Sequence, residues 1–218
     1  LERLEYRGYD SAGIATILEG ELHRVRAQGK LYNLREKLEQ EVNPSQIGIG
    51  HTRWATHGAP TDGNAHPHLG GESQKLSLIH NGIIENYEVL RTELKAAGYI
   101  FSSETDTEVI AHLIHQQYVA SGQKSIADAV KAVLPKLHGA YAIGVIAQDS
   151  PDTLVGARVG SPLVIALGNQ ENFLASDALA LAGRAYSMMY LEEGDVAVLK
   201  ADSVEVLDLI LRRYQPSG

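Results

Sequence analysis

The second part of the chain is a run of short segments, each with the length and composition of a β-strand. The segments begin near residue 140, and turn residues such as those at 160–162 and 193–194 separate them. We expect strands at 140–147, 153–159, 163–167, 172–175, 186–191, 195–200 and 203–209, with one short helix at about 177–183. Links this short join antiparallel strands, whereas parallel strands need long crossover connections. The run therefore predicts antiparallel sheets and an α+β fold rather than a doubly wound parallel one.

The first part of the chain supplies a hairpin and most of the helices. Segments 12–18 and 21–27 predict a hairpin about Glu19 and Gly20. Apolar periodicity predicts helices at 1–5 (the last turns only), over Leu31, Leu34 and Leu38, at 86–97, from Thr105 onward, and at about 124–135. No repeat, linker or low-complexity tract interrupts the pattern. We therefore expect residues 1–218 to form one domain.

Two polar stretches stand out because each follows a short apolar run. The stretch HTRWATHG at 51–58 follows 47–50, and the stretch HNGIIEN at 80–86 follows 76–79. Both apolar runs are typical of buried strands that stop at a polar loop. Loops on strand ends are where binding and catalytic groups tend to lie. The two stretches are therefore the candidate functional site.

The residue types in these stretches are suited to an anionic ligand and a developing negative charge. Arg53 is a bidentate clamp for an anion, and Thr56 and His57 are further hydrogen-bonding groups. Asn81 offers a side-chain amide next to the unobstructed backbone N–H of Gly82. Such a pair of donors is suited to stabilising an oxyanion.

Charge and composition exclude several classes of protein. The net charge of −8 and the pI near 5.6 argue against nucleic acid as a partner, because a phosphate backbone requires a basic face. No apolar run approaches membrane-spanning length and no signal peptide opens the chain, so we expect no membrane partner. Cysteine is absent, which excludes disulfides, thiolate metal sites and a cysteine nucleophile among these residues. The composition therefore predicts a soluble cytoplasmic protein.

Five of the nine histidines lie between positions 51 and 80, namely His51, His57, His66, His68 and His80. A histidine cluster can bind zinc, and the spacing of His66 and His68 keeps a metal-dependent hydrolase open as an alternative. No Asp or Glu lies at a matching spacing, however, and no pair in the cluster has helical i, i+4 spacing. We therefore favour packing and hydrogen-bonding roles, and we predict no metal site and no cofactor.

Two further charged residues have both a structural and a functional interpretation. Thr105 and Glu108 fit a capping box, so Asp106 is explained equally well as an acid in the first turn of a helix and as a ligand-binding group. Arg7 either supports the site or pairs with a neighbouring carboxylate, and the spacing alone favours the ion pair.

Seven blocks together carry a resemblance that spans nearly the whole chain. They are YRGYDSAG at 6–13, HTRWATHG at 51–58, NAHPH at 64–68, HNGIIEN at 80–86, SETDTEV at 103–109, GSPL at 160–163 and LEEGD at 191–195. In this order and spacing they resemble the glutaminase domain of the glucosamine-6-phosphate synthase family, whose members are class II glutamine amidotransferases. The resemblance implies an N-terminal-nucleophile hydrolase fold, which is a four-layer αββα sandwich of two antiparallel sheets with helices outside.

The resemblance also implies a reaction and its partners. In the family an N-terminal cysteine attacks the side-chain amide of glutamine, with its own α-amino group as the base. The released ammonia passes to a separate isomerase domain of the same protein, which converts fructose 6-phosphate to glucosamine 6-phosphate. The small-molecule substrate of this domain would be glutamine, and the full-length protein would be a homodimer.

Matching motifs assign roles to individual residues. Arg53 would bind the α-carboxylate of glutamine and Asp106 its α-ammonium group. The rest of the binding pocket would be formed by Thr56, His57 and Gly82. The oxyanion hole would be formed by the side chain of Asn81 and the N–H of Gly82, and Trp54 would belong to the gating loop that closes over glutamine.

The sequence departs from the family's pattern at its two ends. The family's opening segment, which carries the cysteine, has no counterpart before Leu1, and the isomerase domain has none after Gly218. We expect an N-terminally incomplete glutaminase domain that is inactive as written, because the cysteine nucleophile is absent. None of the hydroxyl groups of Ser11, Thr52 and Thr56 has an evident base that would make it a substitute. A catalytically dead glutamine-binding module and the metal-dependent hydrolase remain as alternatives.

Overall fold

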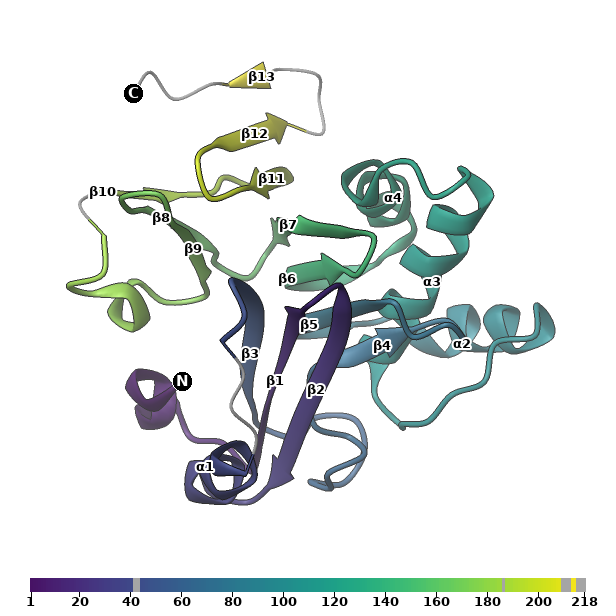
Figure 1. Ribbon diagram of the computed structural model, residues 1–218. Helices are drawn as coiled ribbons and strands as arrows, with labels where there is room; N and C mark the ends of the chain where they lie inside the picture. Colours follow the sequence, from purple (N-terminus) through teal and green to yellow (C-terminus); the bar gives the residue numbers. More distant parts are fainter. Residues whose placement is uncertain (41–43, 186, 209–212, 215–218) are drawn as a thin grey trace.

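The computed structural model describes residues 1–40, 44–185, 187–208 and 213–214. Its largest element is an antiparallel sheet of seven strands in the order β13-β12-β11-β7-β6-β5-β4 (Figure 1). These strands are β4 (His68–Gly70), β5 (Leu76–Ile84), β6 (Gly139–Ala147), β7 (Ser150–Val159), β11 (Asp195–Leu199), β12 (Val204–Asp208) and β13 (Arg213–Tyr214). Its centre is apolar because β5, β6 and β7 are rich in Leu, Ile, Val and Ala.

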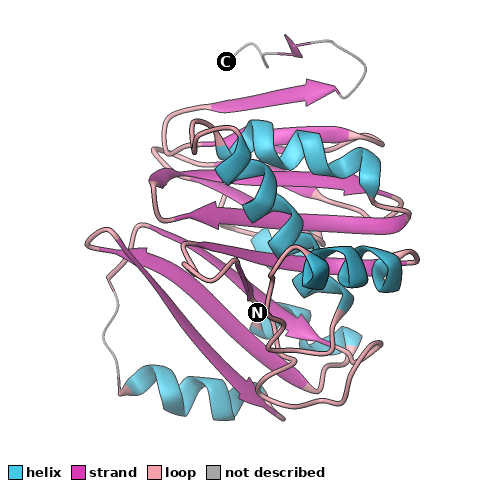
Figure 2. Ribbon diagram, turned by 90° about the vertical axis from the view of Figure 1, so that its right-hand side faces the viewer, coloured by secondary structure: helices cyan, strands magenta, loops and turns pink. Residues whose placement is uncertain are grey.

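Three α-helices cover one face of this sheet, as Figure 2 shows. They are α2 (Tyr87–Ala96), α3 (Asp106–Ala120) and α4 (Ile126–Val133), and a 3-10 turn η2 (Leu134–Lys136) follows α4 at Pro135. Helix α3 lies in the middle of the layer, and Ile110 and Ile114 are completely buried against the sheet. Burial of this face, rather than helix propensity alone, stabilises α3 in its place.

A second layer of strands packs on the other face of the large sheet. In the described residues it consists of two three-stranded antiparallel sheets, in the orders β2-β1-β3 and β10-β8-β9. Their strands are β1 (Ser11–Leu18), β2 (Glu21–Gln28), β3 (Ile47–Arg53), β8 (Val164–Leu167), β9 (Asn172–Ala175) and β10 (Ser187–Tyr190). Figure 2 shows the strands of the first of these sheets running obliquely to those of the large sheet.

Strand β1 shows how alternation places this layer between two cores. Ala15 and Ile17 face the large sheet and pack with Ile146 of β6. Ala12 and Ile14 point the other way, toward helix α1 (Leu31–Glu39). The 3-10 helices η1 (Glu2–Arg7) and η3 (Ala178–Leu181) also lie on this outer side. The predicted α+β sandwich with two antiparallel strand layers and helices outside is confirmed.

Most predicted elements are present, but several boundaries and types differ. The segments predicted as helices at 1–5 and 177–183 are 3-10 turns, and the short strand β4 was not predicted. The predicted strand ends at 186 and 209 lie outside the described residues. Among the described helices, none combines the length and apolar character that crossing a membrane requires.

The predicted stops of β3 and β5 are wrong, and this difference shapes the site. Strand β3 continues to Arg53, which pairs with Ser11 of β1, and β5 continues to Ile84, which pairs with Gly139 of β6. Residues 51–53 and 80–84 therefore lie at the ends of regular strands, whereas 54–58 and 85–86 lie on loops. Polar residues occur in these strands because one side of each strand faces a cavity. Polar residues at such positions break the apolar pattern, so the pattern predicts the end of the strand too early.

Candidate functional site

A cavity of about 280 Å³ opens where the ends of β3 and β5 meet the N-terminus of α3. It is lined by Arg7, Gly8, His51, Thr52, Arg53, Trp54, Thr56, His66, His80, Asn81, Gly82, Thr105, Asp106 and Thr107. The cavity thus brings together every predicted site residue except His57. These residues come from four separate parts of the sequence, so the fold is what assembles them.

Arg53, the last residue of β3, is a cation held in place by backbone carbonyls. Its side chain is only 3% exposed, and its guanidinium donates to the carbonyl oxygens of His57 at 2.5 Å, Gly58 at 3.1 Å and Ala59 at 3.0 Å. Burial lowers the pKa of Arg53, and the charge of Asp10 opposes that shift. The guanidinium group of an arginine stays protonated at neutral pH even when burial lowers its pKa in this way. The remaining guanidinium N–H groups are left for an anionic ligand.

The residues that follow Arg53 form an exposed loop over the cavity. Trp54 is 67% exposed and lies beside Gly8, where an added Cβ would be 3.5 Å from the indole ring. Asp10 holds the loop from below, because its Oδ2 accepts a hydrogen bond of 2.8 Å from the N–H of Ala55. Thr56 is exposed and lines the cavity. The first part of the loop, at 54–56, is thus held by this carboxylate, whereas 57–59 are held by Arg53.

His57 does not line the cavity. Its ring packs against Tyr87 of α2 at a centroid distance of 4.5 Å, and its carbonyl is one of the three that hold Arg53. The structure therefore places His57 beside the site, where it acts on Arg53 through its backbone.

Asp106, the first residue of α3, supplies an anion on another wall of the cavity. It is 3% exposed, and its Oδ2 accepts a hydrogen bond of 2.9 Å from the N–H of Ile84 at the end of β5. Its position at the N-terminus of a 15-residue helix also stabilises the negative charge. Asp106 is thus both a first-turn acid and a residue of the cavity, so the structure unites the two interpretations of it.

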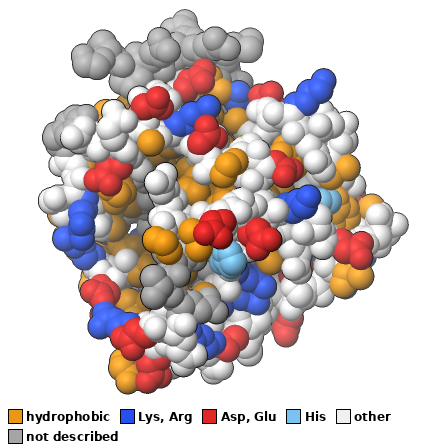
Figure 3. All heavy atoms as spheres, viewed as in Figure 1, with side chains coloured by type: hydrophobic (Ala, Val, Ile, Leu, Met, Phe, Trp, Pro, Cys, Tyr) orange, Lys and Arg blue, Asp and Glu red, His pale blue; other side chains and the backbone are white. Residues whose placement is uncertain are grey.

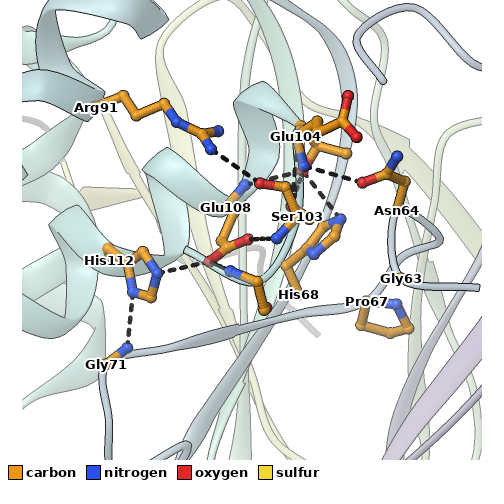
Figure 4. Close-up of polar contacts among 12 residues, drawn as sticks. Gly63, Asn64, Pro67, His68, Gly71, Arg91, Ser103, Glu104, Glu108 and His112 are labelled. Atoms are coloured by element: carbon orange, nitrogen blue, oxygen red, sulfur yellow. Dashed lines mark hydrogen bonds and ion pairs between the residues drawn. The ribbon is translucent and has the colours of Figure 1, made fainter. Parts of the chain in front are cut away.

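The start of α3 is fixed by a buried polar network, drawn in Figure 4. Thr105 caps the helix as predicted, because its hydroxyl accepts from the N–H of Glu108. Glu108, however, does not bond back to Thr105, but accepts from the N–H groups of Ser102 at 2.9 Å and Ser103 at 2.6 Å and pairs with His112. Burial opposes its ionisation, but these hydrogen bonds outweigh burial and lower the pKa of Glu108.

Asn81 lies on β5, and His51 on the neighbouring end of β3 fixes its amide. His51 Nε2 and Asn81 Oδ1 are 2.8 Å apart. Burial lowers the pKa of His51 to about 4, so at neutral pH the ring is uncharged, and facing Oδ1 of Asn81 requires the tautomer that donates through Nε2. The Nδ2 group of Asn81 is then turned away from His51 and has no partner among the described residues. It is a free donor in the cavity.

Gly82, the next residue, has a backbone that other residue types cannot adopt at this position. Its φ is +119°, and an added Cβ would be 2.2 Å from the carbonyl oxygen of Ala140 on β6. Glycine is required because the backbone of β5 approaches β6 so closely.

The buried histidines form a packed and hydrogen-bonded group under the cavity. His51 stacks on His66 with ring centroids 4.0 Å apart, and His80 and His66 both bond to the hydroxyl of Thr107. Burial lowers the pKa of His66 and His80, and it lowers that of His68 to about 3. In residues 1–40, 44–185, 187–208 and 213–214, no three His, Asp or Glu side chains are arranged to hold a metal ion. The metal-dependent alternative therefore finds no support.

Arg7 lines the cavity, and within the described chain it forms no ion pair with a carboxylate. The ion pair that the spacing favoured is therefore not found. On the face shown in Figure 3, acidic and basic side chains are interspersed.

Several residues that support the site were not predicted. Asp10, Arg24, Arg26 and Asn64 all bond to the backbone of the loops around the cavity. Asp10 and Asn64 belong to motif blocks, but no sequence signal indicated their partners. Most of these bonds join residues far apart in the chain, so local pattern does not reveal them.

A sequence model of the family described as the glutamine amidotransferase domain matches residues 51–183. The chain belongs to this family. It is 54% identical over 209 residues to the glutamine–fructose-6-phosphate aminotransferase (isomerizing) of Zymomonas mobilis, covering 96% of this chain and 34% of that protein. The corresponding protein of Pseudomonas putida is also 54% identical over 209 residues, again with 34% of its length covered. The amidotransferase chain thus spans about a third of the length of these curated relatives.

Solved structures of amidotransferases confirm the fold. The glutamine phosphoribosylpyrophosphate amidotransferase of B. subtilis superposes with a TM-score of 0.78 at 27% identity, over 97% of this chain and 46% of that one. A structure described as the allosteric regulatory enzyme of purine biosynthesis gives a TM-score of 0.82 at 28% identity, over 96% and 45%. The predicted N-terminal-nucleophile hydrolase fold of class II amidotransferases is confirmed.

Proposed function

We propose that the cavity binds L-glutamine as a zwitterion, with Arg53 on the α-carboxylate and Asp106 on the α-ammonium group. The observation that carries this proposal is a buried cation and a buried anion that line one small cavity, each held by backbone hydrogen bonds. A zwitterion requires two fixed charges of opposite sign at its own spacing. Thr56 and Gly82 complete the pocket, His57 contributes the carbonyl that holds Arg53, and Trp54 closes over the ligand.

We further propose that Asn81 and Gly82 form an oxyanion hole for attack on the side-chain amide of glutamine. The partnerless Nδ2 of Asn81 supports this role, because His51 fixes its direction before the ligand binds. A donor that is already oriented needs no reorganisation as negative charge develops. Arg7 adds a positive charge at the edge of the same cavity.

The 218 residues contain no cysteine, so we propose that this polypeptide binds glutamine without hydrolysing it at an enzymatic rate. For the whole protein we propose that the ammonia is transferred to fructose 6-phosphate, and the names of the relatives support this proposal. The products would be glutamate and glucosamine 6-phosphate, and an isomerase domain of the same protein would form the latter. The homodimer and the cytoplasmic location remain predictions from sequence.

A calorimetric titration of the 218-residue chain with L-glutamine tests the proposal. We expect binding by the wild type and a loss of affinity of at least tenfold in Arg53→Lys, with no ammonia release at an enzymatic rate. A chain that does not bind glutamine would contradict the proposed pocket.

The absence of cysteine favours a second candidate, a catalytically dead glutamine-binding module. Extending the chain with the cysteine-bearing N-terminal segment of the family separates the two. We expect the extended protein to release ammonia from glutamine without an isomerase domain. An extended protein that binds glutamine and remains inactive would support the dead module instead.

A further inference from the structure

One buried side chain, Asn64, joins the loop around Arg53 to the segment that leads into Asp106. Asn64 is 4% exposed. Its Nδ2 donates to the carbonyl oxygen of Ala59 at 2.9 Å, and its Oδ1 accepts from the N–H of Glu104 at 2.9 Å. Figure 4 shows the amide of Asn64 pointing toward the backbone of Glu104. The side chain thus bridges two backbone segments that are 45 residues apart in sequence.

Each of these two segments carries one of the charges of the cavity. The carbonyl of Ala59 also accepts a hydrogen bond of 3.0 Å from Arg53 Nη1, so Arg53 and Asn64 share one acceptor. Glu104 lies two residues before Asp106. The two charged groups are therefore connected through a single amide.

The packing around this bridge is close. Gly58 has a φ of +84°, and an added Cβ would be 2.7 Å from Asn64 Nδ2 and 3.0 Å from the Cβ of Glu104. The loop, the amide and the segment before α3 are thus in contact at one point. A change in the amide would shift the loop relative to the helix.

We propose that Asn64 is a positioning residue that sets the separation between Arg53 and Asp106. The inference rests on the proposed function, because it supposes that both charges bind one α-amino acid. The ammonium and carboxylate of an α-amino acid are attached to the same carbon, so both ion pairs form only at one separation. Asn64 therefore confers selectivity for ligands that carry both groups over ligands that carry one.

The substitution Asn64→Ala removes both hydrogen bonds and tests this role. Asn86→Ala is the matched control, because the amide of Asn86 also bridges two backbone groups, at Lys136 and His138, and does not line the cavity. The ligands are L-glutamine and 4-carbamoylbutanoate, which lacks the α-ammonium group. Calorimetry or competition in the 218-residue chain gives the dissociation constants, and thermal melts give the stability of each variant.

We expect Asn64→Ala to weaken L-glutamine binding about tenfold or more and 4-carbamoylbutanoate binding less than threefold. Asn86→Ala is expected to change neither constant, even if it lowers the melting temperature as much. A merely structural role of Asn64 would weaken both ligands equally, and this result would overturn the proposal. A folded Asn64→Ala variant with wild-type affinity for glutamine would overturn it as well.

A second variant covers the case in which Asn64→Ala does not fold. Asn64→Asp keeps the acceptor for the N–H of Glu104 but replaces the donor to Ala59 with an oxygen and, when ionised, adds a negative charge. The same preferential loss of glutamine binding is expected, and unchanged selectivity in this variant contradicts the proposal. Failure of the proposed function has a different signature, because the wild type would then bind neither ligand.

Discussion

The two walls of the cavity differ in how the chain holds them. Asp106 and Asn81 belong to α3 and β5, whose backbones are fixed by helical hydrogen bonds and by pairing with β6 in the seven-stranded sheet. Arg53 ends β3, and beyond it the wall is a loop tied down by bonds from a few side chains. The contrast indicates that the strand-and-helix wall is preformed, whereas the loop wall depends on individual hydrogen bonds.

This difference has a functional meaning if the cavity binds glutamine. The preformed wall carries the donor groups that would stabilise the negative charge that develops during the reaction. Rigid donors are an advantage there, because they need no reorganisation. The loop wall carries Trp54, and a loop with few contacts is able to open for the ligand and close over it. We therefore expect substitution of Asn81 to affect turnover, whereas substitution of Asp106 on the same wall or of Arg53 on the loop wall should affect binding.

Acid should disrupt the junction between the walls, and this is the largest effect on stability that we expect. The pKa of His51 is lowered from 6.5 to about 4 and that of His68 to about 3 by burial. The unfolded chain therefore binds more protons than the folded one below pH 6.5, and stability falls as the pH is lowered toward 4. Together these two histidines lower the free energy of unfolding by about 3 kcal/mol at pH 5.5 relative to pH 8.

Urea unfolding at pH 8 and pH 5.5 measures this loss. Removal of the exposed histidines by His23→Gln and His138→Gln should leave the difference between the two pH values unchanged. Equal free energies of unfolding at pH 8 and pH 5.5 in the wild type would mean that the buried histidines are not held neutral.

Asn81→Ala tests the catalytic role of the preformed wall. In the chain extended with the cysteine-bearing segment, kcat should fall by roughly 10²–10³, about 2.7–4 kcal/mol, because the amide faces charge that appears only in the transition state. KM for glutamine should change little. Asn172→Ala, which removes an amide donor to Lys200 far from the cavity, is the control. An unchanged kcat would remove Asn81 from the oxyanion hole.

The elements of both walls were predictable to different degrees. Periodicity and capping residues located α3, and the cap at Thr105 was correct because it depends on residues three apart in sequence. Strand β4 was missed because it has three residues and begins with a buried histidine. The extension of β3 to Arg53 was missed because a strand that faces a polar cavity does not alternate in the usual way.

The site itself was predicted through its motifs and not through its supports. Arg53, Asn81 and Asp106 were assigned from short blocks, and the fold brings them to one cavity. The amide of Asn64 and the carboxylate of Asp10 act on backbone groups about 5 to 45 residues away. Contacts of this kind depend on the tertiary fold, so neither composition nor spacing contains them.

Arg53→Lys tests the loop wall and should give a smaller effect than Asn81→Ala. Lysine keeps the charge and loses the planar fork that binds a carboxylate. In the extended protein, KM for glutamine should rise by at least tenfold, about 1.4 kcal/mol, as measured by initial rates. Arg158→Lys is the control, because Arg158 also donates to a loop carbonyl, that of Leu191, outside the cavity. A normal KM in Arg53→Lys would mean that Arg53 is a purely structural arginine.

Asp106→Asn should weaken glutamine binding, although its effect on the stability of the fold should be the smallest effect that we expect. Asparagine still accepts from the N–H of Ile84, and the lost interaction with the helix dipole is about 0.3–1 kcal/mol. Asp128→Asn makes the same change in the first turn of α4, away from the cavity. Thermal melts of the two variants should agree within about 1 kcal/mol, whereas only Asp106→Asn should lose glutamine affinity. A much larger loss of stability in Asp106→Asn with intact affinity would favour a capping role alone.

The central claim is that Arg53 and Asp106 each bind one charged group of the same amino acid. Its most direct test is a calorimetric titration of the wild type, Arg53→Lys and Asp106→Asn with glutamine and two analogues. The analogues are 4-carbamoylbutanoate, which lacks the ammonium group, and 4-aminobutanamide, which lacks the carboxylate. We predict that Arg53→Lys weakens only the ligands with a carboxylate and that Asp106→Asn weakens only those with an ammonium group. Equal losses for all three ligands in both variants would contradict the account.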